Sequence, residues 1–331
     1  MKKDKNNNKK EERKTINGRP LIDFIGHRKF FISISLTLIV ISIIFFFARG
    51  FNLGIDFRGG TEAIVCMDRI PNRSVTIGEI RSALTTIRPE YKRAKINELK
   101  PLAGGSSGRQ RFSIVIRDVL STVNQKTDFE KHIVEVFNTK ISPKLNTTIE
   151  GFNIVGGFAA SDLKKSAFWA AIIGTILLLI YITIRFEFIF GVGAILALVH
   201  DVIITLGIFS LFYIEVNSPI IAAILTLMGY SLNDTIVVFV RIRENMRRMR
   251  GKPYGEIINL SINQVLSRTI NTSFTTFLTV FVLLLFAGSV LKPFAFALTI
   301  GTVVGTYSSM YIASPILLGW LQRARVKHAR R

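Results

Sequence analysis

The chain has 331 residues, 49% of them hydrophobic, and a mean hydropathy of +0.39, which is too apolar for an ordinary soluble domain and indicates a membrane protein. Its formal net charge is +21, so the positive charge has to be explained by membrane topology or by an anionic partner. The single cysteine, Cys66, excludes an intramolecular disulfide and a thiolate metal cluster, and four scattered histidines argue against a zinc site.

Residues 1–29 form a basic N-terminal tail, and its first 14 residues are charged and rich in asparagine, so we expect those 14 to be disordered. The tail leads into the apolar stretch 30–48, and about 20 apolar residues suffice to cross a bilayer as a helix. A cleaved signal peptide is the alternative. The apolar run is longer than a usual signal core, and "FFFARGFN" offers no small-x-small cleavage site. We therefore predict a retained first transmembrane helix.

Residues 49–165 are polar and predict a small α+β domain. Strands are expected in "IDFRGGTEAIVCM", "AKINELKPL", "RFSIVIRDV" and "TTIEGFNIVGGF", and "AGGSSG" predicts a hairpin connection. A helix over 76–87 begins at a capping box of Thr76 and Glu79, and a second helix over 128–141 has Asp128 as its expected N-cap. The order βαββαβ is that of the ferredoxin-like split unit.

Five more membrane-spanning stretches fill residues 166–320, and a second basic tail follows at 321–331. They are 166–184, 188–212, 218–240, 269–291 and 294–320. The longer basic connection 241–268 contains "EIINLSINQVL", which we expect to form a surface helix or to extend the fifth span. The predicted fold is therefore an α-helical membrane protein of six transmembrane helices, with an α+β domain between helices 1 and 2.

Lysine and arginine are concentrated in three segments, 1–29, 241–268 and 323–331. If six helices cross the membrane in alternating directions, these segments all lie on one side. The loop 213–217, on the other side, has no lysine or arginine. This positive-inside pattern predicts that both termini are cytoplasmic and that the large domain is exported to the periplasm. Nucleic-acid binding is the competing explanation of the basic tails. Topology and anionic membrane lipid already account for the charge, so we expect no nucleic-acid partner.

Three ionisable residues fall inside or at the edge of predicted spans: Asp201, Asp234 and Arg268. A charge at mid-bilayer costs about 2.5–3.5 kcal/mol on insertion scales, so such residues face the bundle interior and are paired. Asp234 lies about 10 Å from the cytoplasmic end of its helix, and Arg268 enters from the same side, so a contact between them is geometrically feasible. The pair is either a fixed salt bridge or a titratable switch, and for Asp201 both interpretations stay open. His200 is expected to point about 100° away from Asp201 and to serve packing.

Polar residues recur at three- and four-residue spacing after Arg268, at Asn271, Thr272, Thr275, Thr276 and Thr279, and so share one helix face. This stripe predicts either hydrogen bonds to neighbouring helices or a water-lined face. Gly301 and Gly305 form a GxxxG pattern, which we expect to pack two helices of this chain closely.

Several strings together resemble the SecF members of the SecD/SecF family of bacterial protein-export proteins, over about residues 26–320. They are "GIDFRGG" (54–60), "VHDVIITLGIFSLF" (199–212), "GYSLNDTIVVFVRIREN" (229–245), "SRTINTSFTTF" (267–277) and "GTYSSMYIASP" (305–315). Two positions depart from the family pattern. Val240 replaces an acidic residue before Arg241, which argues against a salt bridge at that helix end, and Gly157 stands where a proline is usual.

The resemblance implies half of a resistance-nodulation-division permease fold, with SecD supplying the other half. It implies an accessory subunit of the Sec translocase in the bacterial inner membrane that uses the proton motive force to assist preprotein translocation. SecYEG, SecA, YajC and the translocating preproteins are the other implied partners. The family's proton-route aspartate and arginine fall on Asp234 and Arg268, and we take Asp201, Asn233 and Thr272 as further coupling candidates. Gly54, Asp56, Gly59 and Gly60 are the expected structural motif.

No cofactor or enzymatic activity is expected, because the sequence has no Walker-type phosphate loop. The coupling ion is H⁺, with Na⁺ as an open alternative. A proton-driven efflux or lipid exporter of the same superfamily is the competing function, but such pumps usually carry two six-helix halves in one chain. SecD itself would need a longer segment than 49–165. A purely structural scaffold predicts that Asp234 can be replaced freely.

Overall fold

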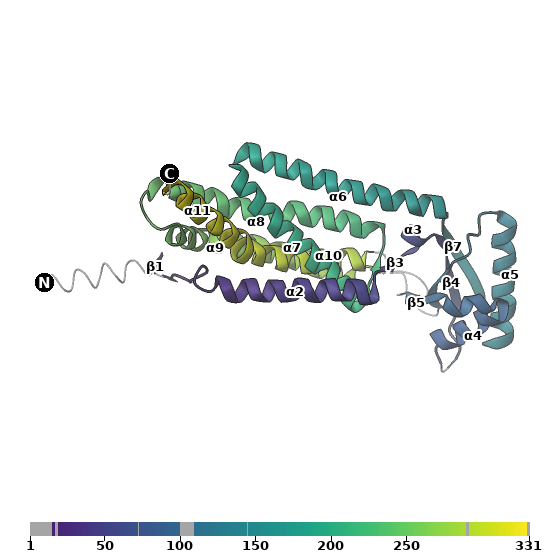
Figure 1. Cartoon of the computed structure of the whole chain (residues 1–331). Coiled ribbons are helices and arrows are strands. Elements are labelled where there is room, and N and C mark those ends of the chain that lie inside the picture. The colour runs from purple at the N-terminus through teal and green to yellow at the C-terminus, as the bar shows by residue number, and fades with distance from the viewer. Residues whose placement is uncertain are drawn as a thin grey trace.

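The computed structural model describes residues 15–16, 19–71, 73–99, 109–143, 145–288 and 291–329. A bundle of long helices occupies one end of the molecule, and a small domain of strands and helices occupies the other (Figure 1). The predicted disorder of residues 1–14 and the hairpin connection "AGGSSG" lie outside the described residues.

Six helices in the described part of the chain are long and apolar enough to cross a membrane, as predicted. The first five are α2 (Arg28–Arg49), α6 (Gly157–Arg185), α7 (Phe188–Phe212), α8 (Ser218–Arg248) and α9 (Tyr254–Phe286). The sixth is built from α10 (Lys292–Ser308), a single π-helical turn η2 (Ser309–Ala313) and α11 (Ser314–Ala329). The start of α2 and the end of α11 lie at the end of the bundle away from the domain (Figure 1).

Five of the six described spans are longer than the apolar stretches that revealed them, and α7 alone coincides with its stretch. The fifth, α9, begins at Tyr254 directly after Pro253, so "EIINLSINQVL" extends the span instead of forming a separate surface helix. The second, α6, begins at Gly157, nine residues before the predicted boundary at 166. These added turns carry polar residues, which a hydropathy pattern does not register.

The domain between α2 and α6 has the predicted ferredoxin-like topology. Its strands are β4 (Gly60–Asp68), β5 (Lys95–Leu99), β6 (Arg109–Ile116) and β7 (Thr147–Val155). They pair in the order β5-β6-β4-β7, with every pair antiparallel. The helices are α4 (Ile77–Ile87), the short 3₁₀ turn η1 (Pro89–Arg93) and α5 (Val123–Lys140). One face of the sheet and both α-helices enclose a core that includes Val65, Phe112, Leu84 and Phe137.

Capping residues fix where the two domain helices begin. The predicted capping box at α4 is present, since Thr76 Oγ1 accepts from the Glu79 amide while the Glu79 carboxylate accepts from the Thr76 amide. The prediction that Asp128 is the N-cap of the second helix was wrong. Helix α5 starts five residues earlier, because Thr122 and Gln125 form a capping box of their own.

The "GIDFRGG" motif forms the root of the domain, at the point where it meets the membrane helices. The predicted strand is interrupted, because Ile55–Arg58 forms one helical turn, α3. Gly59 and Gly60 follow with φ of +75° and +134°, and a Cβ on Gly60 would lie 2.4 Å from the Ile116 carbonyl oxygen. Only glycine fits these backbone conformations without strain, so the two glycines allow β4 to leave the turn at this angle.

Asp56 ties the root to the bundle. Its carboxylate accepts hydrogen bonds from the amide and the hydroxyl of Ser218, both at 2.7 Å, at the first residue of α8. A carboxylate at a helix N-terminus satisfies free amides and is favoured by the helix dipole. Beside it, the two-residue strands β3 (Asn52–Leu53) and β8 (Glu215–Val216) pair in parallel, and the Gly54 amide donates to the Val216 carbonyl. These contacts place the motif between the domain and the bundle, where a structural role was predicted for it.

Helices α7, α8 and the sixth span form the interior of the bundle, while α2, α6 and α9 lie mostly on its outside. The GxxxG pattern packs α10 against α8, as predicted. A Cβ on Gly301 would lie 2.4 Å from Leu227, and one on Gly305 would lie 3.0 Å from the Cβ of Ser231. These two glycines bring α10 close enough to α8 for side-chain hydroxyls to reach across.

Candidate functional site in the membrane bundle

Asp234 is a buried carboxylate on α8, with 2% of its surface exposed. Its Oδ2 accepts a 2.7 Å hydrogen bond from the hydroxyl of Ser273 on α9, and Ser273 is its only hydrogen-bond partner among the described residues. Thr269, one turn before Ser273 on the same face of α9, has a buried hydroxyl without a described partner. A carboxylate held by one neutral donor in a membrane interior is a site where a proton can bind, because the neutral acid is the form that burial favours.

The predicted contact between Asp234 and Arg268 is absent. Among the described residues, Arg268 forms no salt bridge, and its side chain is exposed on α9. Helix α8 continues to Arg248, so Asp234 lies about 21 Å from the end of its helix and not about 10 Å as predicted. Rotation about α9 separates the two side chains as well. Arg268 precedes Ser273 by five residues, which is about 140° around an α-helix, so the two side chains leave α9 in different directions.

Arg268 instead lines a hollow of about 470 Å³ between α8 and α9, on the side of the chain termini. Arg241 and Glu244 line the same hollow and form a 2.8 Å salt bridge, and Arg241 also donates to Gln264. The replacement of an acidic residue by Val240 therefore does not remove the salt bridge at this helix end, contrary to the prediction. Glu244, one turn further along α8, forms the salt bridge with Arg241 instead.

The polar stripe on α9 faces away from the rest of the chain. Thr272, Thr275, Thr276 and Thr279 all donate their hydroxyls to carbonyls of α9 itself. Asn271, Thr275 and Thr279 are exposed, and Asn233 on α8 is exposed as well. The prediction that the stripe bonds neighbouring helices does not hold for the described part of this chain. Of the predicted coupling residues, Asp234 alone is buried in this region.

Asp201 on α7 is the centre of a second buried site. Its Oδ2 accepts from Ser231 on α8 at 2.5 Å and from Ser308 on α10 at 2.8 Å, and its Oδ1 lies 2.8 Å from His200 Nδ1. His200 does not point away from Asp201, so its predicted direction was wrong, whereas its ring is buried as expected of a packing residue. Two serine hydroxyls and one imidazole nitrogen thus surround a single carboxyl group. The site joins three helices.

His200 extends this site toward α2. Its ring stacks on Tyr307 at a centroid distance of 6.2 Å, and the Tyr307 hydroxyl lies 2.9 Å from Ser35 Oγ and donates to the Phe31 carbonyl. His200 Nε2 is buried and has no partner among the described residues. The Asp201 site thus places a carboxyl group and a titratable ring next to each other, and one nitrogen of that ring has no partner among the described residues.

The serines of both sites escaped sequence reasoning. Ser273, Ser231 and Ser308 carry the hydroxyls that hold Asp234 and Asp201, yet serine is common in membrane helices and no spacing sets these three apart. Ser308 did offer one signal, because it follows the GxxxG pattern by one turn and so lies on the face of α10 that meets α8.

These features define an integral membrane protein of six helices with an α+β domain after the first and with buried carboxylates in its bundle. Two profiles of one family match the sequence. "Protein export membrane protein SecD/SecF, C-terminal" matches residues 133–323, and "SecD/SecF GG Motif" matches residues 44–65. The second match covers the root built by Asp56, Gly59 and Gly60. The chain belongs to the SecD/SecF family of protein-export membrane proteins.

Relatives agree over nearly the whole chain. Protein translocase subunit SecF of Petrotoga mobilis is 51% identical over 306 residues, which cover 92% of this chain and 98% of that protein. Protein translocase subunit SecDF of Thermus thermophilus is 37% identical and covers 94% of this chain. A solved structure of SecDF from that organism, described as a translocon-associated membrane protein, matches with a TM-score of 0.78 and 36% identity over 93% of this chain. The chain spans 40% of the length of the SecDF protein.

Proposed function

We propose that the chain is the SecF-type subunit of a two-part membrane complex that uses the proton motive force to assist preprotein translocation by the Sec machinery. The observation that carries this proposal is the buried Asp234 carboxylate, held by Ser273 alone among the described residues, in a chain of the SecD/SecF family. Relatives named as protein translocase subunits support a role in transport and not in catalysis of a covalent reaction. They also favour this role over that of an efflux or lipid exporter.

The proposed partner is a SecD-type subunit, and the polar face of α9 supports this choice. Arg268, Asn271, Thr275 and Thr279 are exposed on a helix that crosses the membrane. Lipid chains offer these groups no hydrogen bonds, so a second protein surface or water is the favourable neighbour. In SecDF relatives this chain's counterpart is fused to a longer polypeptide. A SecD-type half would cover α9 and supply the carboxylate partner that Arg268 lacks among the described residues.

We propose H⁺ as the coupling ion and Asp234 as the group that binds it. Among the described residues, the carboxylate has one hydroxyl neighbour within hydrogen-bond distance, Ser273, whereas a bare Na⁺ needs a shell of several oxygen ligands. One charge that crosses the membrane supplies about 2.3 kcal/mol per 100 mV, which is enough to change helix packing when several protons are used. Asp201 holds its site together, and Asp234 carries the coupling.

The proposed orientation in the membrane rests on the distribution of basic residues. With the basic segments in the cytoplasm of a bacterial cell, both termini lie inside and the ferredoxin-like domain lies in the periplasm, where a preprotein emerges. The proposed partners on the translocation path are SecYEG, SecA and the preprotein, with YajC as an accessory membrane subunit.

The test is Asp234→Asn in inverted membrane vesicles that contain SecYEG, SecA and a SecD-type partner. Export of a preprotein is measured with ATP alone and with an imposed proton gradient. Asparagine keeps the shape and can still accept from Ser273, but it binds no proton. We expect the export rate with ATP alone to be unchanged and the stimulation by the gradient to be lost. Wild-type stimulation in the variant would refute the assignment.

Asn233→Ala serves as the matched control, because Asn233 is adjacent in sequence but exposed. It should retain the stimulation. Replacing the proton gradient by a sodium gradient in wild-type vesicles distinguishes the two ions, since the proposal predicts no response to sodium.

A further inference from the structure

A basic hollow lies where the domain meets the membrane helices. It measures about 470 Å³, and its walls come from the root of the domain, from β6, from the end of η1 and from the loop before α8. Four cationic side chains line it, together with one carboxylate: Arg58, Arg93, Lys95, Arg117 and Glu215. The hollow therefore has an excess of positive charge.

The single carboxylate does not neutralise the arginines. Glu215 Oε2 lies 2.6 Å from Lys95 Nζ, so these two charges compensate each other. Arg58, Arg93 and Arg117 are exposed, and none of them forms a salt bridge with a described residue. Three guanidinium groups without acidic partners around one hollow are a site for an anion.

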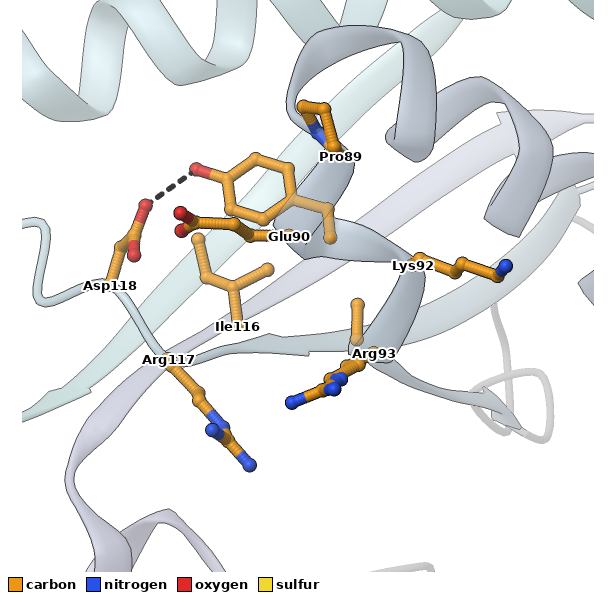
Figure 2. A pocket seen from close by; sticks show the side chains of 9 residues that line it. Pro89, Glu90, Lys92, Arg93, Ile116, Arg117 and Asp118 are labelled. Carbon is orange, nitrogen blue, oxygen red and sulfur yellow. Dashed lines mark hydrogen bonds between the residues drawn. The ribbon is translucent and has the colours of Figure 1, made fainter.

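The neighbouring acidic groups are directed elsewhere. A second hollow of about 580 Å³ shares Arg93 and Arg117 with the first. On its far side Asp118 accepts from the Tyr91 hydroxyl and pairs with Arg88, both at 2.8 Å. Figure 2 shows Glu90 on the side of Asp118, whereas the guanidinium ends of Arg93 and Arg117 lie together on the opposite side.

The hollow lies at the level of the phospholipid headgroups. Part of its wall is Asn52–Leu53, which begins three residues after the end of α2. Another part is Glu215, which lies between the end of α7 and the start of α8. A membrane-spanning helix ends where the headgroup region begins. At this level Arg49 lies over the ring of Tyr213 at 4.8 Å, an arginine and an aromatic residue of the kinds that anchor helices at the interface.

One exposed aromatic side chain lies close to the hollow, at the start of α6. A Cβ on Gly59, which lines the hollow, would lie 3.3 Å from Gly157 at the start of α6. The next residue, Phe158, is 89% exposed. A ligand with an anionic head and an apolar tail can therefore place its head among the arginines and its tail along α6. Free phosphate gains nothing from this second feature.

We propose that this hollow binds the phosphate of an anionic phospholipid from the leaflet next to the domain. Arg93 and Arg117 hold the phosphate oxygens, since a guanidinium presents paired donors that match a phosphate. Arg58 adds a third charge from the root of the domain. The bound lipid would fix the domain against the bilayer at the point where β3 and β8 meet, independently of any proton coupling at Asp234.

The experiment uses the full chain purified in a mild detergent. Native mass spectrometry measures retention of dioleoylphosphatidylglycerol and of dioleoylphosphatidylcholine by the wild type and by the double variant Arg93→Gln/Arg117→Gln. We expect the wild type to retain phosphatidylglycerol preferentially and the variant to bind it about 30-fold more weakly, because each basic residue at an anionic surface contributes roughly a factor of five. Arg69→Gln/Lys131→Gln removes the same charge from exposed positions at the other end of β4 and on α5, and should bind as the wild type does.

Further measurements distinguish the effect of charge from that of folding, and a phospholipid from free phosphate as the ligand. Arg93→Lys/Arg117→Lys keeps the charge but loses the paired donors, so we expect intermediate affinity, and an unchanged melting temperature shows that each variant is folded. Equal retention of phosphatidylglycerol by the glutamine variant would overturn the proposal. So would binding of inorganic phosphate to these arginines without any preference for phosphatidylglycerol, because the site would then serve the free anion.

Discussion

Removing the serines around Asp201 tests whether this carboxylate is held in its ionised form. Ser231 and Ser308 donate to the same oxygen, at 2.5 and 2.8 Å, from two different helices. Interhelical hydrogen bonds in membranes contribute on average about 0.6 and at most about 1.7 kcal/mol. Bonds to a charged acceptor lie toward the upper end. We therefore expect Ser231→Ala and Ser308→Ala each to lower the free energy of unfolding by about 1–1.5 kcal/mol.

The double variant is the sharper measurement. With both hydroxyls gone, the buried carboxylate keeps only His200 as a described partner. An incompletely satisfied buried charge is disproportionately costly, so the double loss should exceed the sum of the single losses by about 0.5–1 kcal/mol. Equilibrium unfolding in mixed micelles of mild detergent and SDS, followed by circular dichroism, measures all three values.

Ser314→Ala is the control for this series. Its hydroxyl is equally buried but donates to the Ser309 carbonyl of its own helix at 3.0 Å, with no charged acceptor. Loss of such a bond should cost less than about 0.5 kcal/mol. If Ser231→Ala and Ser308→Ala are no more costly than this control and their effects simply add, Asp201 is not held as an ionised group and the reasoning is refuted.

Three further predictions concern the α+β domain. Gly60→Ala should destabilise the domain by about 3 kcal/mol and lower its melting temperature, because the strain of a positive φ and a close contact with a carbonyl oxygen add up. Gly151→Ala is the control. A Cβ at this position meets open space, so the melting temperature should be unchanged. Burial and the hydrogen bond to Asp118 raise the pKa of Tyr91 to about 12. In an absorbance titration Tyr91 should therefore stay protonated at about pH 11, where exposed tyrosines ionise. The variant Asp118→Asn should shift the ionisation of Tyr91 to lower pH. Burial raises the pKa of the Cys66 thiol, so labelling by a maleimide at about pH 8 should be at least about 100-fold slower in the folded chain than in SDS; comparable rates would contradict the buried position on β4.

The sequence predicted the parts of the fold that depend on local pattern. Long apolar runs predicted all six spans, and the run at Phe188–Phe212 gave both ends of α7 correctly. The Thr76 capping box was predicted because both of its partners lie within one turn. The Thr122 box has the same spacing, and it was missed because the apolar pattern of α5 becomes regular only after Asp128.

The candidate site was predicted in part, because burial depth and rotation about a helix are separate quantities. Sequence spacing placed Asp234 seven residues from the end of its span, whereas α8 continues to Arg248, 14 residues beyond Asp234. The rotation of α9 against α8 is set by packing along the whole helix, and it brings Ser273, not Arg268, to the carboxylate. His200 was misjudged for a related reason. Adjacent residues diverge by 100° at the backbone, but an imidazole is long enough to turn back to the carboxylate of Asp201.

The contact between Asp56 and Ser218 has a mechanical consequence. Ser218 is the first residue of α8, and α8 continues without interruption to Arg248, past Asp234. Sixteen residues of helix, about 24 Å, separate the anchored end from the carboxylate. The α-helix is stiff over this length, so a displacement of the domain root along the helix axis moves the carboxylate by the same amount. The α+β domain and the buried acid are thus mechanically connected through α8, so a displacement of one is transmitted to the other.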